Sequence, residues 1–521
     1  MENLNKFTVY DSKETSVLSL IEEMSDYMNK IPYSDHKGSW QGLSRPTLSE
    51  EGMRATVEKH IEDIEDLNNK LNTVLNNNKV YNIKTFEEIK NIQFNDGDIL
   101  NITRNILADD TITVDKSIII NGLGNTITCN KNNLNKIFKL KGRRVKITDL
   151  NIDMNLKGRS AIELYYNDLI DVSNCTFTGY TMDYKSSSDN TANDSSILCS
   201  GVKGGKIENC LFYDNGYQYP NETQYLNRCI TMNQSNNMRV VNNVFRNVSQ
   251  CIVTADFNSL VIQGNTFDSY KDNGIYTPSG CCGAKIDNNT FINSEDEAIV
   301  ISGHNVRITN NDFIECFTAI AFNGPFRHSI IQGNKHIRTD KFTTFLRVRP
   351  VASIGQLENV KIIDNMLDGK LDYHIIGLRD TINVTIANNI FKVTCDSSDK
   401  FFISSDGQPI NFTIKENVFE SVGSTCNVYY NINTSTPSGL FSYNTLVNTV
   451  FKWIGGNVRV EGHRIDNMLK LYEDYTSRLS CQGSPEGNIK AVKGSIITDI
   501  SNGNVYTKTT ETSSNTGWVK L

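Results

Sequence analysis

Three acidic residues occupy related places in two neighbouring segments of the sequence: Asp272, then Asp296 with Glu297 beside it. If the chain returns to the same position between the two segments, the two aspartates stack on one face. Two carboxyl groups within ~5 Å suit glycoside hydrolysis as acid and base or nucleophile, because their repulsion raises one pKa and creates a proton donor. Asp272, Asp296 and Glu297 are therefore candidate catalytic residues. The alternative is that these acids only cap turns.

A run of basic residues at 327–349 forms a second candidate site in an otherwise acidic chain. It contains Arg327, Lys335, Arg347 and Arg349 and a single acid. Arg347 and Arg349 are two residues apart, so in a strand both side chains point to the same, outer face. Guanidinium groups can hold phosphate in a bidentate manner. The alternative is a solvated face that forms salt bridges to a neighbouring subunit.

Tyrosines in an insertion at 178–228 form a third candidate site. Tyr217, Tyr219 and Tyr225 lie in this segment, and aromatic side chains on an outer loop suit stacking on sugars. The alternative is a loop that packs on its own solenoid or on the next subunit. The seven histidines are scattered and no Gly-x-x-x-x-Gly-Lys occurs, so we expect neither a metal site nor a cofactor.

A repeat predicts the elements that position these residues. From about residue 81 a short pattern recurs: an apolar residue, two variable positions, Asn, one variable position and a second apolar residue. The Asn of this pattern falls at Asn243, Asn265, Asn289, Asn311, Asn334, Asn365, Asn389, Asn417 and Asn444, with Cys175 and Cys210 at the same slot earlier. The spacing averages about 25 residues, which is typical of a solenoid.

One turn of a β-solenoid brings each short strand beside its copy in the next turn, about 4.8 Å away, so that identical inward residues form ladders. Leucine-rich repeats have similar periods, but here Ile, Val and Phe flank the Asn and the period varies. We predict an all-β solenoid, a right-handed single-stranded parallel β-helix over residues 81–465. Aligning the inward positions places Asp272 and Asp296 on adjacent turns, each three residues before its inward Ile; the aligned residues are Ile230, Ile252, Ile275, Ile299, Ile320 and Leu346.

The two ends of the chain differ from this repeat. Residues 1–52 begin with an amphipathic helical stretch, and residues 53–80 carry heptads with Ile at both seam positions, Ile61 and Ile64. That composition favours a trimeric coiled coil over a dimer. The alternative is a helix that packs on its own domain. Residues 466–480 are predicted to be a short helical linker, and residues 481–521 a small β-module.

Composition and charge exclude several classes of protein. The net charge of −7 argues against a general nucleic-acid binder. No apolar run is long enough for a membrane span, and the N-terminus lacks the pattern of a secretory signal, so we expect synthesis in a cytoplasm and no membrane insertion. Asn is unusually frequent, with 65 residues. Most of the twelve cysteines lie in apolar strand patterns and are expected to be buried thiols.

The order of these parts resembles bacteriophage tailspikes, homotrimeric receptor-binding proteins with a pectate-lyase-like β-helix. The stretch Gly38-Ser39-Trp40-Gln41-Gly42 resembles the virion-attachment region of small podoviruses that infect staphylococci. The resemblance implies that residues 1–52 attach to tail or connector proteins of a virion. It also implies that the β-helix binds a host glycopolymer, such as wall teichoic acid or exopolysaccharide.

The resemblance leaves the activity open. The run 294–303 is similar to the acidic strand of β-helix polygalacturonases, but Glu297 replaces the usual second Asp and the downstream Gly-His-Gly motif is missing. A depolymerase that cleaves host polymer, a trimeric adhesin that only holds it, and a structural spacer of the virion tail are all compatible with the family. The acids favour the depolymerase, and the missing motifs favour the adhesin.

Overall fold

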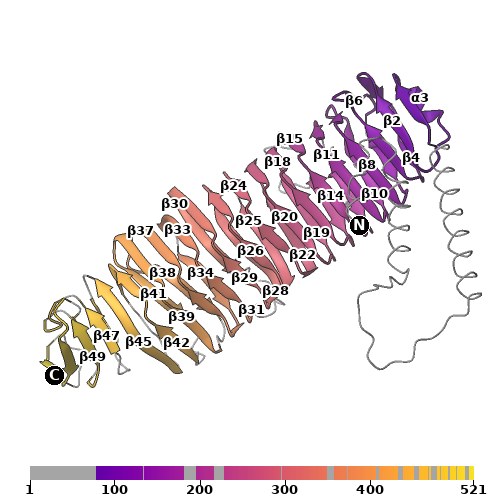
Figure 1. The fold of residues 1–521 in the computed structure, drawn as a ribbon. Coiled ribbons are helices and arrows are strands. Elements are labelled where there is room, and N and C mark those ends of the chain that lie inside the picture. Colours follow the sequence, from indigo (N-terminus) through magenta and orange to yellow (C-terminus); the bar gives the residue numbers. More distant parts are fainter. Residues whose placement is uncertain are drawn as a thin grey trace, which may run out of the picture.

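The protein is an elongated rod of stacked β-strands, seen in a computed structural model (Figure 1). The structure describes residues 78–521 with several gaps. The gaps of five or more residues are 181–194, 216–227, 349–356, 432–437, 451–456, 471–477 and 511–515. The predicted attachment region 1–52 and nearly all of the predicted coiled coil at 53–80 therefore lie outside the described residues.

Each turn of the rod contributes strands to three parallel sheets, which wind as a right-handed β-helix. The first sheet carries, in order, β4 (Ile112–Val114), β7 (Leu134–Leu140), β10 (Gly158–Tyr165), β13 (Ser195–Ser200), β16 (Arg228–Asn233), β19 (Gln250–Ala255), β22 (Ile275–Cys282), β25 (Glu297–His304), β28 (Thr318–Arg327), β30 (Lys335–Val348), β34 (His374–Arg379), β38 (Phe401–Asp406), β41 (Cys426–Asn431) and β44 (Thr449–Val450). Two short strands, β31 (Leu357–Glu358) and β35 (Thr381–Ile382), extend the pairing beyond the end of β28.

The second sheet follows the first along the chain. It carries β1 (Val80–Ile83), β2 (Asp98–Ile102), β5 (Ile118–Asn121), β8 (Arg144–Thr148), β11 (Leu169–Ser173), β14 (Gly205–Glu208), β17 (Met238–Val241), β20 (Leu260–Gln263), β23 (Lys285–Asp287), β26 (Arg307–Thr309), β29 (Ile330–Gln332), β32 (Lys361–Ile363), β36 (Thr385–Ala387), β39 (Phe412–Lys415), β42 (Ser438–Ser442), β45 (Asn457–Asp466), β47 (Arg478–Cys481) and β49 (Ile496–Asp499).

The third sheet completes each turn. It carries β3 (Ile106–Ala108), β6 (Thr126–Cys129), β9 (Asn151–Asp153), β12 (Thr176–Thr178), β15 (Leu211–Asn215), β18 (Val244–Val248), β21 (Thr266–Tyr270), β24 (Thr290–Ile292), β27 (Asp312–Ile314), the first part of β30, β33 (Met366–Leu371), β37 (Ile390–Cys395), β40 (Val418–Gly423), β43 (Thr445–Val447) and the last part of β45. The predicted parallel β-helix is confirmed.

The predicted Asn ladder runs through the interior between the second and third sheets. Asn265 is 1% exposed, and its Oδ1 accepts hydrogen bonds from both the backbone N–H of Asn243 (2.9 Å) and the side-chain amide of Asn243 (3.0 Å). Its own Nδ2 donates to Oδ1 of Asn289 at 2.9 Å and to a backbone carbonyl. The same arrangement continues to Asn444. Each ladder Asn therefore satisfies backbone groups that the tight turn would otherwise leave unpaired.

The Asn-Asn pairs divide two tasks between neighbouring residues. In the pair Asn288-Asn289, the first residue adopts a left-handed backbone conformation with φ of 54°, and the second joins the ladder. The pair Asn310-Asn311 repeats this division, with φ of 54° at Asn310. Among residues with a Cβ atom, Asn tolerates the left-handed region best. Together these two tasks explain part of the high Asn content of the chain.

A column of aromatic rings fills the core beside the Asn ladder. Successive rings are stacked with centroids 4.5–5.0 Å apart and interplanar angles of 3–12°; the residues are Phe177, Phe212, Phe245, Phe267, Phe291 and Phe313. The next turn places the fully buried His336 opposite Phe313. Offset ring stacking along the axis keeps each turn in register with its neighbours, because a shift of one residue would turn the rings outward.

The N-terminal end of the rod is covered by a short helix, α3 (Phe86–Lys90), which sequence reasoning did not anticipate. Thr85 caps it: its side chain accepts from the backbone N–H of Glu88, and the Glu88 carboxylate accepts from the backbone of Thr85. This reciprocal arrangement satisfies donors that the first turn leaves open. Phe86 and Ile89 point into the core and cover the first turn.

The C-terminal end corrects one prediction. The described parts of the expected helical linker 466–480 are strands: β46 (Leu469–Lys470) pairs with β48 (Ile489–Lys490), and β47 begins at Arg478. The second sheet runs on through β45, β47 and β49, so its apolar residues pack as further strands instead of as a helix. The predicted C-terminal β-module ends in antiparallel pairs that join β49, β50 (Val505–Lys508) and β51 (Trp518–Lys520).

Two expectations from composition can be compared with the described part of the chain. Eleven of the twelve cysteines have side chains that the structure describes; these are free thiols, and all are buried except the half-buried Cys282. The prediction of buried thiols is therefore confirmed there. No helix in the described residues is long and apolar enough to cross a membrane.

Candidate functional site

The three candidate acids lie where the first sheet begins its strands on two consecutive turns. The predicted alignment is confirmed pair by pair: Ile252 lies opposite Ile275, and Ile275 opposite Ile299. Asp272 precedes β22, and Asp296 precedes β25 by one residue. Because both lie three residues before an aligned Ile, the register places the two aspartates at the same slot of neighbouring turns.

Hydrogen bonds between turns connect these acids to polar neighbours where the strands of the first sheet begin. Arg228 Nε donates to Gln250 Oε1 at 3.2 Å, and the side-chain amide of Gln250 donates to the Asp272 carboxylate. Asn273 Nδ2 donates to Glu297 Oε2 at 3.4 Å. We call the residues Arg228, Gln250, Asp272, Asn273, Asp296 and Glu297 the acid stripe. The stripe crosses four turns and runs parallel to the rod axis.

The exposure of the three acids separates their possible roles. Asp272 and Asp296 are half-buried and can meet a ligand, whereas Glu297 is only 2% exposed. The Glu297 carboxylate and backbone carbonyl both accept from Asn273, each at 3.4 Å. In this arrangement Glu297 holds Asn273 in place but cannot itself touch a polymer on the surface. Sequence reasoning did not foresee this burial, because it depends on what covers the outer face.

The predicted basic patch is distributed over different parts of the rod. Arg327 ends β28 and pairs with Glu358 at 3.4 Å. Lys335 is exposed at the start of β30 in the third sheet, whereas Arg347 lies in the first sheet opposite Ala321. Arg349 lies outside the described residues. The run is therefore contiguous in sequence but is divided between two sheets in space.

Two further members of the basic run point inward. His336 is fully buried, and Arg338 is 7% exposed and lies over the Phe317 ring at 5.4 Å. Burial lowers the pKa of His336 to about 4, although its hydrogen bond with the Cys316 carbonyl opposes this change. The imidazole is therefore neutral at physiological pH and belongs to the core.

The tyrosine group cannot be placed on a surface. Tyr217, Tyr219 and Tyr225 fall in the gap 216–227, outside the described residues. Of the same insertion, Tyr180 is 3% exposed and belongs to the core. For Tyr180 the alternative therefore holds, in which the residue packs against the solenoid. Sugar stacking by the other three tyrosines stays a prediction.

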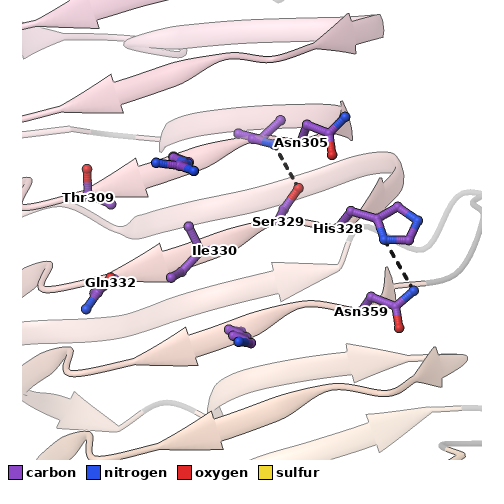
Figure 2. A pocket seen from close by; sticks show the side chains of 10 residues that line it. Asn305, Thr309, His328, Ser329, Ile330, Gln332 and Asn359 are labelled. Atoms are coloured by element: carbon purple, nitrogen blue, oxygen red, sulfur yellow. Dashed lines mark hydrogen bonds between the residues drawn. The ribbon is translucent and has the colours of Figure 1, made fainter.

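A groove that the sequence did not reveal lies on the outer face of the second sheet. It has a volume of about 700 Å³ and crosses β26, β29 and β32. Figure 2 shows its lining: His328 and Asn359 lie at one end of the strands, Thr309 and Gln332 at the other, and Ile330 between them. The remaining lining residues are Asn305, Val306, Arg307, Ser329 and Lys361. We call this the second-sheet groove.

Acidic side chains around the groove are already engaged. Asp287 is 8% exposed and binds Lys285 at 3.1 Å and the Thr309 hydroxyl at 2.6 Å. Burial alone would raise the pKa of Asp287, but hydrogen bonds from Thr309, Lys285 and Asn310 outweigh it and hold the pKa below its usual range. Asp287 is thus a charged, fully occupied acceptor at the edge of the groove.

Neither the acid stripe nor the groove has the composition of a metal site. Among the described residues, no group of three or more His, Cys, Asp or Glu side chains is arranged to hold a metal ion.

Comparisons with known proteins concern the fold. Residues 135–313 and 228–372 match the family model described as a right handed beta helix region. A search of curated proteins gives no match. Among solved structures, a mannuronic acid specific polysaccharide family 6 lyase from human gut microbiota is similar, with 16% identity over 64% of this chain and 86% of that chain and a TM-score of 0.44.

Two other solved structures are also similar to this chain. A tailspike protein of E. coli bacteriophage HK620, in complex with a hexasaccharide, has 11% identity over 70% of this chain and 69% of its own, with a TM-score of 0.41. A periplasmic alginate epimerase has 11% identity over 61% of this chain and 77% of its own, with a TM-score of 0.32. At these identities the likeness concerns the β-helix and is no basis for assigning a ligand.

Proposed function

We propose that this chain is a receptor-binding spike of a bacteriophage tail, which binds a host surface glycopolymer along the first sheet. In this proposal residues 1–52 attach to tail or connector proteins of the virion, and residues 53–80 hold three chains together. The polymer is wall teichoic acid or an exopolysaccharide of a Gram-positive host such as a staphylococcus. The resemblance of residues 38–42 to the virion-attachment region of small podoviruses supports the virion location.

The observation that carries the proposal is the repetition of the acid stripe from turn to turn. Gln250 and Asp272 are linked by a hydrogen bond across one step of the stack, and Asn273 and Glu297 across the next. Steps between stacked strands are about 4.8 Å. Gln250, Asn273 and Glu297 are at most 5% exposed and form the buried side of the stripe, whereas Asp272 and Asp296 are half-buried and can meet a ligand. Two acids one step apart suit a linear polymer whose hydroxyl groups recur along its length.

Binding to the stripe can be tested with purified polymers. We expect the full chain to bind wall teichoic acid or exopolysaccharide from a susceptible host, and Gln250→Leu to weaken that binding because Asp272 loses its amide partner. Thr290→Ala, an outward change in the third sheet, is the matched control and should bind normally. Normal binding by Gln250→Leu together with a folded variant would contradict a polymer site at the stripe.

A second candidate function, hydrolysis of the bound polymer, is favoured by the position of Asp272 and Asp296. Both are half-buried and occupy one slot of adjacent turns, so one can donate a proton while the other attacks or activates water. The alternative is a trimeric adhesin without catalysis. New reducing ends released from the polymer would distinguish hydrolysis from mere binding.

Asp296→Asn and Asp272→Asn separate these two functions. If the spike is a hydrolase, each change should abolish cleavage and leave binding largely intact, because an amide keeps the shape but cannot transfer the proton. If the spike is an adhesin, the wild-type chain releases no reducing ends and both variants adsorb normally. Cleavage that persists in both variants would place the chemistry elsewhere on the molecule.

A further inference from the structure

The second-sheet groove contains two basic side chains without acidic partners. Arg307 and Lys361 are both exposed, and neither forms an ion pair with any described residue. The nearby acids are occupied: Glu358 binds Arg327, and Asp364 accepts from the Gln332 amide at 2.9 Å. The groove is therefore a local positive site on a chain whose net charge is −7. It lies on another sheet than the acid stripe and does not depend on it.

The register of the strands fixes how these two cations are arranged. Arg307 on β26 lies opposite Ile330 on β29, and Ile330 lies opposite Lys361 on β32. Two steps of about 4.8 Å separate the backbones of the two basic residues by roughly 10 Å. By this register the half-buried Ile330 lies between them. A ligand in the groove thus meets an apolar floor with one cation on each side.

Amide and hydroxyl groups line the two ends of the groove. Asn359 and His328 lie at the end where the strands begin, and Thr309 and Gln332 at the end where they finish (Figure 2). Thr309 and Gln332 donate to Asp287 and Asp364, which leaves their oxygen atoms able to accept further hydrogen bonds. Such groups suit the hydroxyls of a sugar.

The end formed by His328 and Asn359 is held rigid by its own row of amides. Asn411 Nδ2 donates to Asn383 Oδ1 at 2.7 Å, Asn383 Nδ2 donates to Asn359 Oδ1 at 2.9 Å, and the Asn359 amide reaches His328 Nδ1 at 3.4 Å. His328 has a left-handed φ of 50°, like the Asn residues of the same column. A rim that is fixed before binding loses little conformational entropy when a ligand arrives.

From these features we propose that the second-sheet groove binds an anionic saccharide, a short stretch of sugars that carries phosphate or carboxylate groups. The cations Arg307 and Lys361 hold the negative groups, and the Ile330 side chain contacts the apolar face of a sugar ring. A volume of about 700 Å³ lies within the range of small-molecule sites and suits a few sugar units. Arginine binds both phosphate and carboxylate in a bidentate manner.

Calorimetric titration of the full chain with three probes tests the proposal. The probes are a ribitol-phosphate oligomer, tetragalacturonate and the neutral maltotetraose. We expect at least one anionic probe to bind. Its affinity should fall as the salt concentration rises, because the charged contacts are partly exposed to solvent. Binding of the phosphate probe alone, or of the carboxylate probe alone, identifies the charged group. Equal binding of maltotetraose, or no binding of either anionic probe, would overturn the proposal.

Three variants locate the binding on the molecule. Arg307→Gln combined with Lys361→Gln should lower the affinity for the anionic probe at least ~10-fold, because two charge-assisted contacts are lost. Ile330→Glu places a carboxylate between the cations and should have a similar effect. Arg239→Gln removes an exposed cation from the same face outside the groove, and should change affinity less than ~2-fold.

The outcomes separate this site from the acid stripe. Thermal melting checks that the double variant and Arg239→Gln are both folded. If the two folded variants bind the anionic probe equally well, the groove is not the anion site. Asp272→Asn and Asp296→Asn should leave binding of the anionic oligomer unchanged, since they lie on the first sheet. Failure of stripe-dependent binding would therefore leave the groove result standing, and the reverse also holds.

Discussion

A single ladder asparagine satisfies an unusual number of polar groups. Asn289 Oδ1 accepts from the backbone N–H and the side-chain amide of Asn265, at 3.0 and 2.9 Å. Its Nδ2 donates to Asn311 Oδ1 and to the carbonyls of Ile262 and Asp287, at 2.9, 3.0 and 3.1 Å. All of this takes place with the residue 1% exposed. Removing the amide therefore leaves several buried groups unpaired at once.

Asn289→Leu is expected to lower the free energy of unfolding substantially. Each buried donor or acceptor that loses its partner costs ~1–3 kcal/mol, and leucine replaces none of them. Thr290→Leu, an outward change at the next position, is the control and should stay close to wild type. Urea unfolding of the three chains measures the difference, and equal midpoints for all three would show that the ladder contributes little.

His336 gives the molecule a pH-dependent stability of predictable sign. It lies opposite Phe313 in the aromatic column, and burial lowers its pKa to about 4, whereas the ordinary value is about 6.5. Between these values the unfolded chain binds a proton that the folded chain does not. Stability should therefore fall as the pH drops from about 6.5 to 4, by up to ~3 kcal/mol from this residue.

His336→Phe should flatten that part of the pH dependence, because phenylalanine binds no proton. The comparison uses the slope of unfolding free energy against pH, so a change in absolute stability from the lost contact with Thr343 does not affect it. Urea unfolding at pH 7, 6, 5 and 4.5 gives both slopes. An identical slope in both chains would mean that His336 is not buried in the folded state.

Much at this scale could be predicted from the sequence. The Asn slot and the inward Ile positions, such as Ile275 and Ile299, recur with a spacing that only one face of a solenoid satisfies. The burial of Glu297 could not be predicted, because it depends on side chains and connections outside the repeat. The same is true of His336, whose sequence neighbours suggested an exposed basic face.

At the scale of elements, α3 closes the open end of the β-helix. The first turn would otherwise expose its inward side chains and unpaired strand edges, which favour aggregation. Phe86 and Ile89 cover this end, and the capping pair Thr85 and Glu88 fixes where the helix begins. The helix therefore serves as a lid for the stack more than as an independent element.

Thr85→Ala is expected to destabilise this end by ~1 kcal/mol, because the capping hydrogen bonds are lost. Hydrogen exchange should show faster opening of β1 and β2 while the central turns stay protected, since each turn contacts mainly its neighbours. Thr113→Ala, an exposed change on β4, is a suitable control. Uniformly faster exchange along the whole rod would argue against a local cap.

The two proposed binding surfaces differ in how readily the sequence predicts them. The acid stripe was found because Asp272 and Asp296 are one repeat apart. The second-sheet groove was missed because Arg307 and Lys361 are two repeats apart, with Ile330 between them. A signal existed: the residue before the first apolar position of the repeat is basic at Lys285, Arg307 and Lys361. Comparing the residues at the same position of successive repeats would have identified these basic residues as one group.

At the scale of the whole molecule, we predict a homotrimer held by residues 53–80. Sedimentation of the full chain should give three times the mass of 58.6 kDa. Deleting residues 54–78 should weaken the trimer more than it lowers the melting temperature of the β-helix, because solenoid turns depend on their neighbours. A monomeric full chain would contradict the prediction, and so would a β-helix that unfolds on deletion.

The inner Asn ladder also gives the rod a net dipole along its axis. Backbone donation from Asn243 to Asn265 Oδ1 fixes which atom of each amide is oxygen, and every amide nitrogen then points to the next turn. Nine aligned carboxamides, from Asn243 to Asn444, add their dipoles, with the positive end toward the C-terminal tip. The short outer row from Asn411 to Asn359 points the opposite way. A polyanion approaching the rod would therefore meet slightly different potentials at the two ends of an otherwise uniform column.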